Sequence, residues 1–144
     1  MPYKILEDIA IADACYELTG NSLSEIFHSG FLALSSCGVE LDSIEPNIEK
    51  ELSIGNSDLE RLLYDFLEEI IFFKDAEFLV FKECDVKVVF DDEKQKYALE
   101  AKLFGREFDD TIKSITDVKA MTYYQLYVKE IKQGKWEARV TFDL

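Results

Sequence analysis

Apolar residues recur every three or four positions in two stretches of the chain, and a helix-capping sequence precedes each stretch. Ser22 followed by Glu25 opens the first stretch, which continues at helical spacing to about Gly38. Ser57 followed by Glu60 opens the second. Its apolar positions are Leu59, Leu62, Leu63, Phe66, Leu67, Ile70 and Ile71. This spacing places them on one face of a helix, so the pattern predicts two amphipathic helices.

Shorter β-type patterns fill the chain before and between these helices. Residues 3–18 predict one or two short strands with a half-polar face. Residues 39–46 have no clear period and predict a loop, whereas the apolar residues at alternate positions of 48–54 predict a short strand. Residues 79–90 and 96–104 are β-rich and flank a polar turn, which predicts an antiparallel hairpin.

The last part of the chain alternates between apolar and polar residues. Residues 118–131 alternate throughout and predict one strand. Gln133 and Gly134 then predict a turn into a final strand over 136–144, with Trp136 on its apolar face. No linker of Pro, Gly or Ser and no repeat divides the sequence, so we expect one domain over residues 1–144. The expected fold class is α+β, with antiparallel β-sheet packed by two helices.

Charge and composition narrow the possible partners. Sixteen basic and thirty acidic residues give a formal charge of −14, which opposes binding to nucleic acid or to an anionic membrane. The three cysteines show no CxxC spacing, so they predict neither a zinc site nor a disulfide framework. The first twenty residues lack the pattern of a signal peptide, and no apolar run approaches the length needed to span a membrane. We expect a cytoplasmic protein with no membrane association.

Common catalytic motifs are absent from the sequence, and carboxylates are the main candidates for chemistry. The single histidine, His28, lies among apolar residues of the first predicted helix and is typical of a partly buried or surface histidine. Asp13 and Asp143 stand out because aspartate is disfavoured inside strands. They are either exposed residues on a strand face or oxygen ligands for a hard cation such as calcium or magnesium, to which a carboxylate at Leu144 would add. A hairpin turn at 133–134 predicts that Asp143 lies opposite Tyr124, with Lys119 further along the same strand.

Several separate segments resemble the archease family. Residues 62–69, continuing through 75–78, are similar to the central helix and following strand of that family. Residues 118–123, Val-Lys-Ala-Met-Thr-Tyr, resemble its [IV]KA[VM]T[YF] strand. Residues 136–144 resemble its closing strand, which carries an aspartate next to last, and the Ala-Asp pair ending at Asp13 occupies the place of its HTAD element. The similarity spans nearly the whole chain.

The resemblance implies a function and a set of residues. Archeases are accessory proteins of the GTP-dependent RNA ligase that joins tRNA exon halves, and they promote guanylylation and multiple turnover of that ligase. The resemblance therefore implies a non-catalytic activator whose partner is an RNA ligase. It implies a divalent cation, calcium or magnesium, held by Asp13, Asp143 and Leu144, and a functional lysine at Lys119. Glu40 stands about where many members have an aspartate after the first helix, which makes it an additional candidate ligand.

The chain departs from the family pattern in its histidines. Ala10 and Ile11 stand where the family usually has His-Thr, Tyr124 where a histidine often follows Thr-Tyr, and Ile112 near another common histidine. The expected site therefore consists of carboxylates. Two other functions remain open: a metal-dependent phosphoester hydrolase that uses Asp13 and Asp143 to position water, and a chaperone-like modulator.

Overall fold

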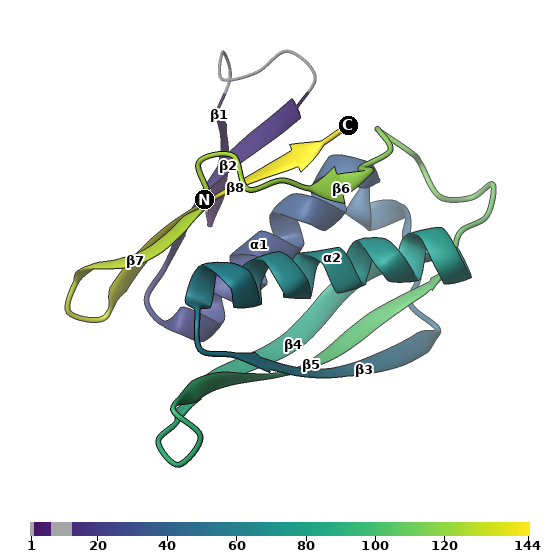
Figure 1. The fold of residues 1–144 in the computed structure, drawn as a ribbon. Coiled ribbons are helices and arrows are strands. Elements are labelled where there is room, and N and C mark those ends of the chain that lie inside the picture. The colour runs from purple at the N-terminus through teal and green to yellow at the C-terminus, as the bar shows by residue number, and fades with distance from the viewer. Residues whose placement is uncertain (1, 7–12) are drawn as a thin grey trace.

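The computed structural model describes residues 2–6 and 13–144 and contains two sheets with a pair of helices between them (Figure 1). The helices are α1 (Leu23–Gly38) and α2 (Leu59–Glu77). The strands are β1 (Tyr3–Leu6), β2 (Asp13–Gly20), β3 (Ile48–Asn56), β4 (Leu79–Asp91), β5 (Lys96–Glu107), β6 (Ala120–Met121), β7 (Tyr127–Lys132) and β8 (Lys135–Asp143). Residues 7–12, which include Ala10 and Ile11, lie outside the described residues.

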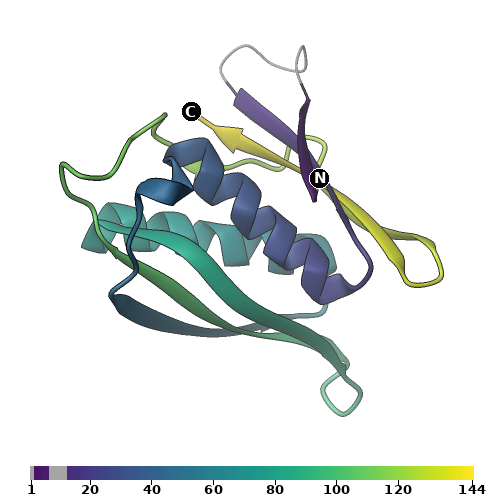
Figure 2. The ribbon, with the colours of Figure 1, turned by 180° about the vertical axis from the view of Figure 1, so that it is seen from behind.

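Every strand pair within the described residues is antiparallel. One sheet has the order β1-β2-β8-β6, with β7 also paired to β8, and the other has the order β3-β5-β4. Seen from behind, α1 and α2 fill the space between the two sheets (Figure 2). Their apolar faces and the inner faces of both sheets form one main core. The predicted α+β class, with antiparallel sheets packed by two helices, is confirmed.

Both predicted helices form, but the second begins differently from the prediction. The Ser22 hydroxyl accepts the Glu25 N–H at 3.1 Å and caps α1, as predicted. The N-cap of α2 is Asp58 rather than Ser57: its carboxylate accepts the N–H groups of Glu60 and of the residue after it. An aspartate caps as well as a serine, so two adjacent capping residues leave the first turn ambiguous in sequence. No helix of the described residues combines the length and apolarity needed to cross a bilayer.

The strands before residue 108 follow the predictions closely. Residues 3–18 contribute two strands, β1 and most of β2, which pair with each other. The hairpin of β4 and β5 forms with a bulge between Phe81 and Glu83. Gly105 is required beside this bulge, because a Cβ there would collide with the Val80 carbonyl. The segment predicted to be a loop contains a short 3-10 helix, Leu41–Ser43.

The prediction of one strand over 118–131 is wrong. The segment forms the short strands β6 and β7, and the residues between them make a tight turn in which the Leu126 N–H donates to the Tyr123 carbonyl at 3.2 Å. Gln125 has a φ of 52°, which interrupts an extended chain. The apolar alternation misleads because Tyr124 lies in this turn and is 46% exposed rather than packed in the core.

Candidate functional site

Asp13 and Asp143 are direct cross-strand neighbours. Asp13 begins β2, Asp143 ends β8, and the two residues are paired in the antiparallel register. The next pair along, Ala14 and Phe142, is buried in the core. Because side chains alternate along a strand, both aspartates point to the opposite, outer face of the sheet, with Cβ atoms about 5 Å apart.

This arrangement is unfavourable for the fold alone. Two like charges directly opposite each other on one face of a sheet destabilise it. Two carboxylates on neighbouring strands can supply the oxygen ligands that calcium and magnesium prefer. The oxygen atoms of Asp13 and Asp143 are therefore the type of ligand that suits a hard cation, and a bound cation would relieve the repulsion between the two carboxylates.

Lys119 is anchored beside this pair. Its backbone N–H donates to the Asp143 carbonyl at 2.8 Å, and the following residue, Ala120, is paired with Asp143 in the sheet. The prediction that Asp143 lies opposite Tyr124 is therefore wrong, because the turn after β6 shifts the register by four residues. The Lys119 side chain is exposed. The structure thus brings Asp13, Asp143 and Lys119 to one end of the sheet.

Polar residues on one face of α2 hold the segment that carries Lys119. The Glu68 carboxylate accepts the Met121 N–H at 2.6 Å, and the Glu60 carboxylate accepts the Val128 N–H at 3.4 Å. Lys74 donates to the Val118 carbonyl at 2.7 Å. These contacts fix the segment on both sides of β6.

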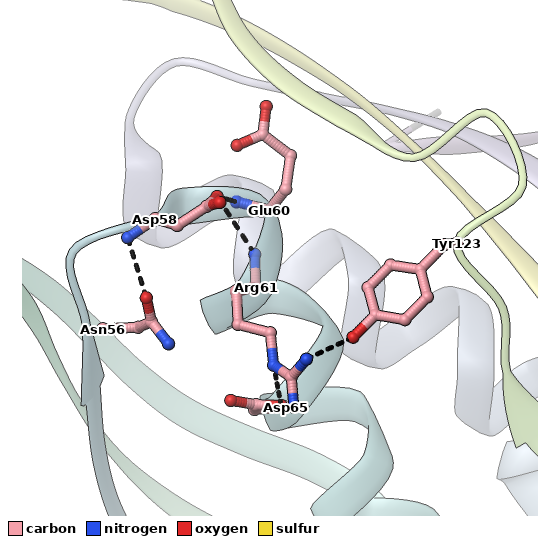
Figure 3. A network of polar contacts seen from close by, with 6 residues as sticks. All are labelled: Asn56, Asp58, Glu60, Arg61, Asp65 and Tyr123. Carbon is pink, nitrogen blue, oxygen red and sulfur yellow. Dashed lines mark hydrogen bonds and ion pairs between the residues drawn. The ribbon is translucent and has the colours of Figure 1, made fainter.

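An aromatic stack completes the attachment of this segment to α2. The rings of Tyr64 and Tyr123 lie parallel with centroids 4.2 Å apart. The Arg61 guanidinium lies 5.5 Å from the Tyr64 centroid. It also donates to the Asp65 carboxylate at 3.0 Å and to the Tyr123 hydroxyl (Figure 3). The sequence pattern did not single out these residues, although Glu60, Tyr64 and Glu68 recur every four positions along the side of α2 that borders its apolar stripe.

Comparison with known proteins identifies the family of the chain. The Archease protein family (MTH1598/TM1083) matches residues 3–144. The chain belongs to the archease family. It is 36% identical to the protein archease of Pyrococcus furiosus over 126 residues, which cover 87% of each chain, and 32% identical to that of Methanopyrus kandleri over the full length of both. The solution structure of Methanobacterium thermoautotrophicum protein 1598 superposes with a TM-score of 0.82 at 27% identity and covers 99% of both chains.

The other candidate ligands suggested by the archease pattern lie in different surroundings. Glu40 follows α1, donates its N–H to the Lys113 carbonyl at 2.8 Å and places its carboxylate 3.9 Å from the Lys113 ammonium. Leu144 is half-buried against the core beside Asp143. Within residues 2–6 and 13–144, no three histidine, cysteine or acidic side chains gather to hold a metal ion. The ligand roles of Glu40 and Leu144 stay predictions.

His28 is a half-buried helix histidine, as one of its two sequence interpretations predicted. Its Nε2 lies 2.7 Å from a carboxylate oxygen of Glu83 on β4. The imidazole thus links α1 to β4, an edge strand of the three-stranded sheet. The contact between His28 and Glu83 therefore serves to hold α1 against β4.

A second polar row crosses the outer face of the five-stranded sheet four residues from the aspartates. Arg139 on β8 is paired with Glu17 on one side and Tyr127 on the other. Its guanidinium lies 3.8 Å from the Glu17 carboxylate and 5.6 Å from the centre of the Tyr127 ring. Burial, with a hydrogen bond of 2.6 Å to Glu137, raises the pKa of Tyr127 to about 12. This row fastens β2, β8 and β7 together and so supports the end of the sheet where the aspartates lie.

Proposed function

We propose that this archease is a non-catalytic activator of the GTP-dependent RNA ligase that joins tRNA exon halves in the cytoplasm. It promotes guanylylation of the ligase and its multiple turnover. Family membership supports this role. The observation that carries the proposal is the pairing of Asp13 with Asp143 next to the anchored Lys119. The net charge of −14 agrees with a protein that contacts the ligase and leaves RNA binding to it.

The proposed cofactor is a divalent cation, calcium or magnesium, held by Asp13 and Asp143, with Leu144 as a further ligand. When bound, the cation supplies positive charge that offsets the two carboxylates. The carboxylates themselves are oriented by the antiparallel register, which sets their spacing before any ion arrives. Lys119 presents an ammonium group to the partner from the position just before β6.

A reconstituted joining assay tests the proposal. Purified RNA ligase is supplied with GTP and tRNA halves, with and without this protein, and both guanylylation and joining are measured under single- and multiple-turnover conditions. We expect wild type to increase turnover and Lys119→Ala or Asp143→Asn to lose at least ten-fold of that increase. Lys135→Ala is the matched control, because Lys135 is an exposed lysine at the opposite end of β8. Unchanged rates with wild type would rule the function out.

A further inference from the structure

A pocket that neither Asp13 nor Asp143 lines is a second candidate site. A pocket of about 340 Å³ opens where the C-terminal ends of α1 and α2 meet the start of β4 and the connection between β5 and β6. In Figure 1 this green connection passes the C-terminal end of α2. The pocket walls include Leu34, Val39, Ile70, Ile71 and Val80, so the interior is mostly apolar. The ammonium of Lys74 lines the pocket but is occupied by Asp117, Asp75 and the Val118 carbonyl.

Two exposed phenylalanines stand at this pocket. Phe78 is 65% exposed and Phe108 is 44% exposed, and both line the pocket. The Phe108 N–H donates to the Phe78 carbonyl at 2.7 Å, so the two residues are held side by side. Large apolar side chains that remain in water contribute little to folding.

The backbone conformation of Phe78 is one in which a phenylalanine does not help the protein to fold. Phe78 caps the C-terminal end of α2 with a φ of 59°, in the left-handed region that favours glycine. A phenylalanine therefore costs free energy there and recovers little of it by burial. An aromatic contact with another molecule would account for the residue.

Charge around the pocket restricts what that molecule can be. Both phenylalanines are flanked by acidic residues in sequence: Asp75 and Glu77 before Phe78, and Glu107, Asp109 and Asp110 around Phe108. Three of these five carboxylates form ion pairs, since Arg106 bonds Asp109 at 2.6 Å, Lys50 lies 2.9 Å from Glu77 and Lys74 lies 3.3 Å from Asp75. Glu107 and Asp110 add two further negative charges, so acidic residues outnumber the basic ones and the rim keeps a net negative charge. A second copy of this chain would bring a further charge of −14 to an acidic rim.

We propose that this pocket docks a segment of a partner protein that inserts an apolar side chain flanked by lysine or arginine. The apolar side chain fills the cavity between Ile70, Ile71 and Val80, and Phe78 and Phe108 cover it. The basic residues on either side meet the acidic rim. The inference is independent of the aspartate site, because neither Asp13 nor Asp143 lines the pocket.

Fluorescence anisotropy with synthetic peptides tests the proposal without knowledge of the natural partner. The probe is a labelled, amidated peptide with two leucines between two pairs of lysines, and its counterpart carries glutamates in place of the lysines. We expect Phe108→Ala and Phe78→Gly each to weaken binding of the lysine peptide at least ten-fold. Phe90→Ala serves as the control, because Phe90 is 45% exposed at the distant end of β4. It should change binding less than two-fold, and the glutamate peptide should not bind.

Several outcomes would overturn the proposal. Equal binding of the lysine peptide to wild type and to both pocket variants would mean that it follows the overall charge only. Wild-type dimerisation in analytical ultracentrifugation that Phe108→Ala abolishes would assign the pocket to a second copy. Phe78→Gly keeps the test valid if Phe108→Ala unfolds, because glycine suits the backbone at that position and the variant should melt no lower than wild type.

Discussion

Among single residues, the strongest candidates for function are those whose position in the fold costs stability. Asp13 and Asp143 are held opposite each other although like charges repel across strands. Both aspartates stand out in the sequence, because they interrupt β-rich segments near its two ends. Asp143 was predicted to lie opposite Tyr124 rather than Ala120, because the apolar and polar residues of 118–131 keep alternating through the turn after β6.

The paired aspartates predict opposite effects of neutralisation with and without metal. In chelator, Asp143→Asn should stabilise the fold by roughly 0.2–1 kcal/mol, because it removes the cross-strand repulsion with Asp13. In millimolar calcium or magnesium, wild type should melt several degrees higher than in chelator, and Asp13→Asn or Asp143→Asn should not. Differential scanning fluorimetry measures both effects. Asp92→Asn, in the exposed β4–β5 turn, should respond to metal as wild type does. A wild type that melts at the same temperature in metal and in chelator would refute metal binding here.

Tyr127 predicts a loss of stability at alkaline pH. Its pKa is raised to about 12 by burial and by the hydrogen bond to Glu137. A group with a raised folded-state pKa stabilises the fold fully below its unfolded value of about 10, and that contribution is lost as the pH rises from 10 to 12. Tyr127→Phe should therefore flatten the decline of unfolding free energy over this range in urea titrations. Glu137→Gln should flatten it less, because burial is the larger cause; an identical decline in all three proteins would contradict the assignment.

At the scale of elements, the best predicted parts are those with a single repeating pattern. The helices and the β4–β5 hairpin follow from spacing, capping and turn residues, and the structure bears them out. The segment between β5 and β7 is poorly predicted because its shape depends on α2. Glu68, Arg61 and Tyr64 attach it through contacts with residues more than fifty positions away. Such long-range hydrogen bonds and ring stacks produce no periodicity in sequence.

The attachment of this segment predicts a specific effect of Glu68. Glu68→Ala removes the acceptor of the partly buried Met121 N–H and should destabilise the protein by about 1–3 kcal/mol. Hydrogen exchange of the Met121 amide should accelerate, and the proposed activation of the ligase should fall as Lys119 loses its fixed position. Glu69→Ala, one position along the same helix, is the control for helix propensity and charge. Slow exchange at Met121 in the Glu68 variant would show that the carboxylate does not hold β6.

At the scale of the whole molecule, composition predicts a well-packed core and an acidic exterior. The core lies in the layer of helices between the two sheets. The inner faces of both sheets and the apolar stripes of the two helices share the main core. The number of layers could not be predicted, because strand patterns do not specify which strands pair. The sequence supports antiparallel sheets in general, whereas the division into two sheets on opposite sides of the helices depends on contacts between distant segments.

The net charge predicts that salt stabilises the fold. Thirty acidic residues against sixteen basic ones make repulsion the dominant long-range interaction. Raising the ionic strength from about 0.01 M to about 0.15 M shortens the screening length from about 30 Å to about 8 Å. The urea midpoint should therefore rise, and equally with sodium or potassium chloride at matched ionic strength. A midpoint that falls would show that favourable ion pairs outweigh the repulsion.

The position of β8 in the middle of its sheet has a consequence for biosynthesis. β8 pairs with β2 on one side and with β6 and β7 on the other, although it leaves the ribosome after all of these strands. At a synthesis rate of about 5–20 residues per second, several seconds or longer pass between the synthesis of the β1–β2 hairpin and that of β8. Until then Asp13 has no Asp143 beside it. A nascent or truncated chain therefore cannot display the paired aspartates, and only a fully synthesised, folded molecule can engage whatever recognises them.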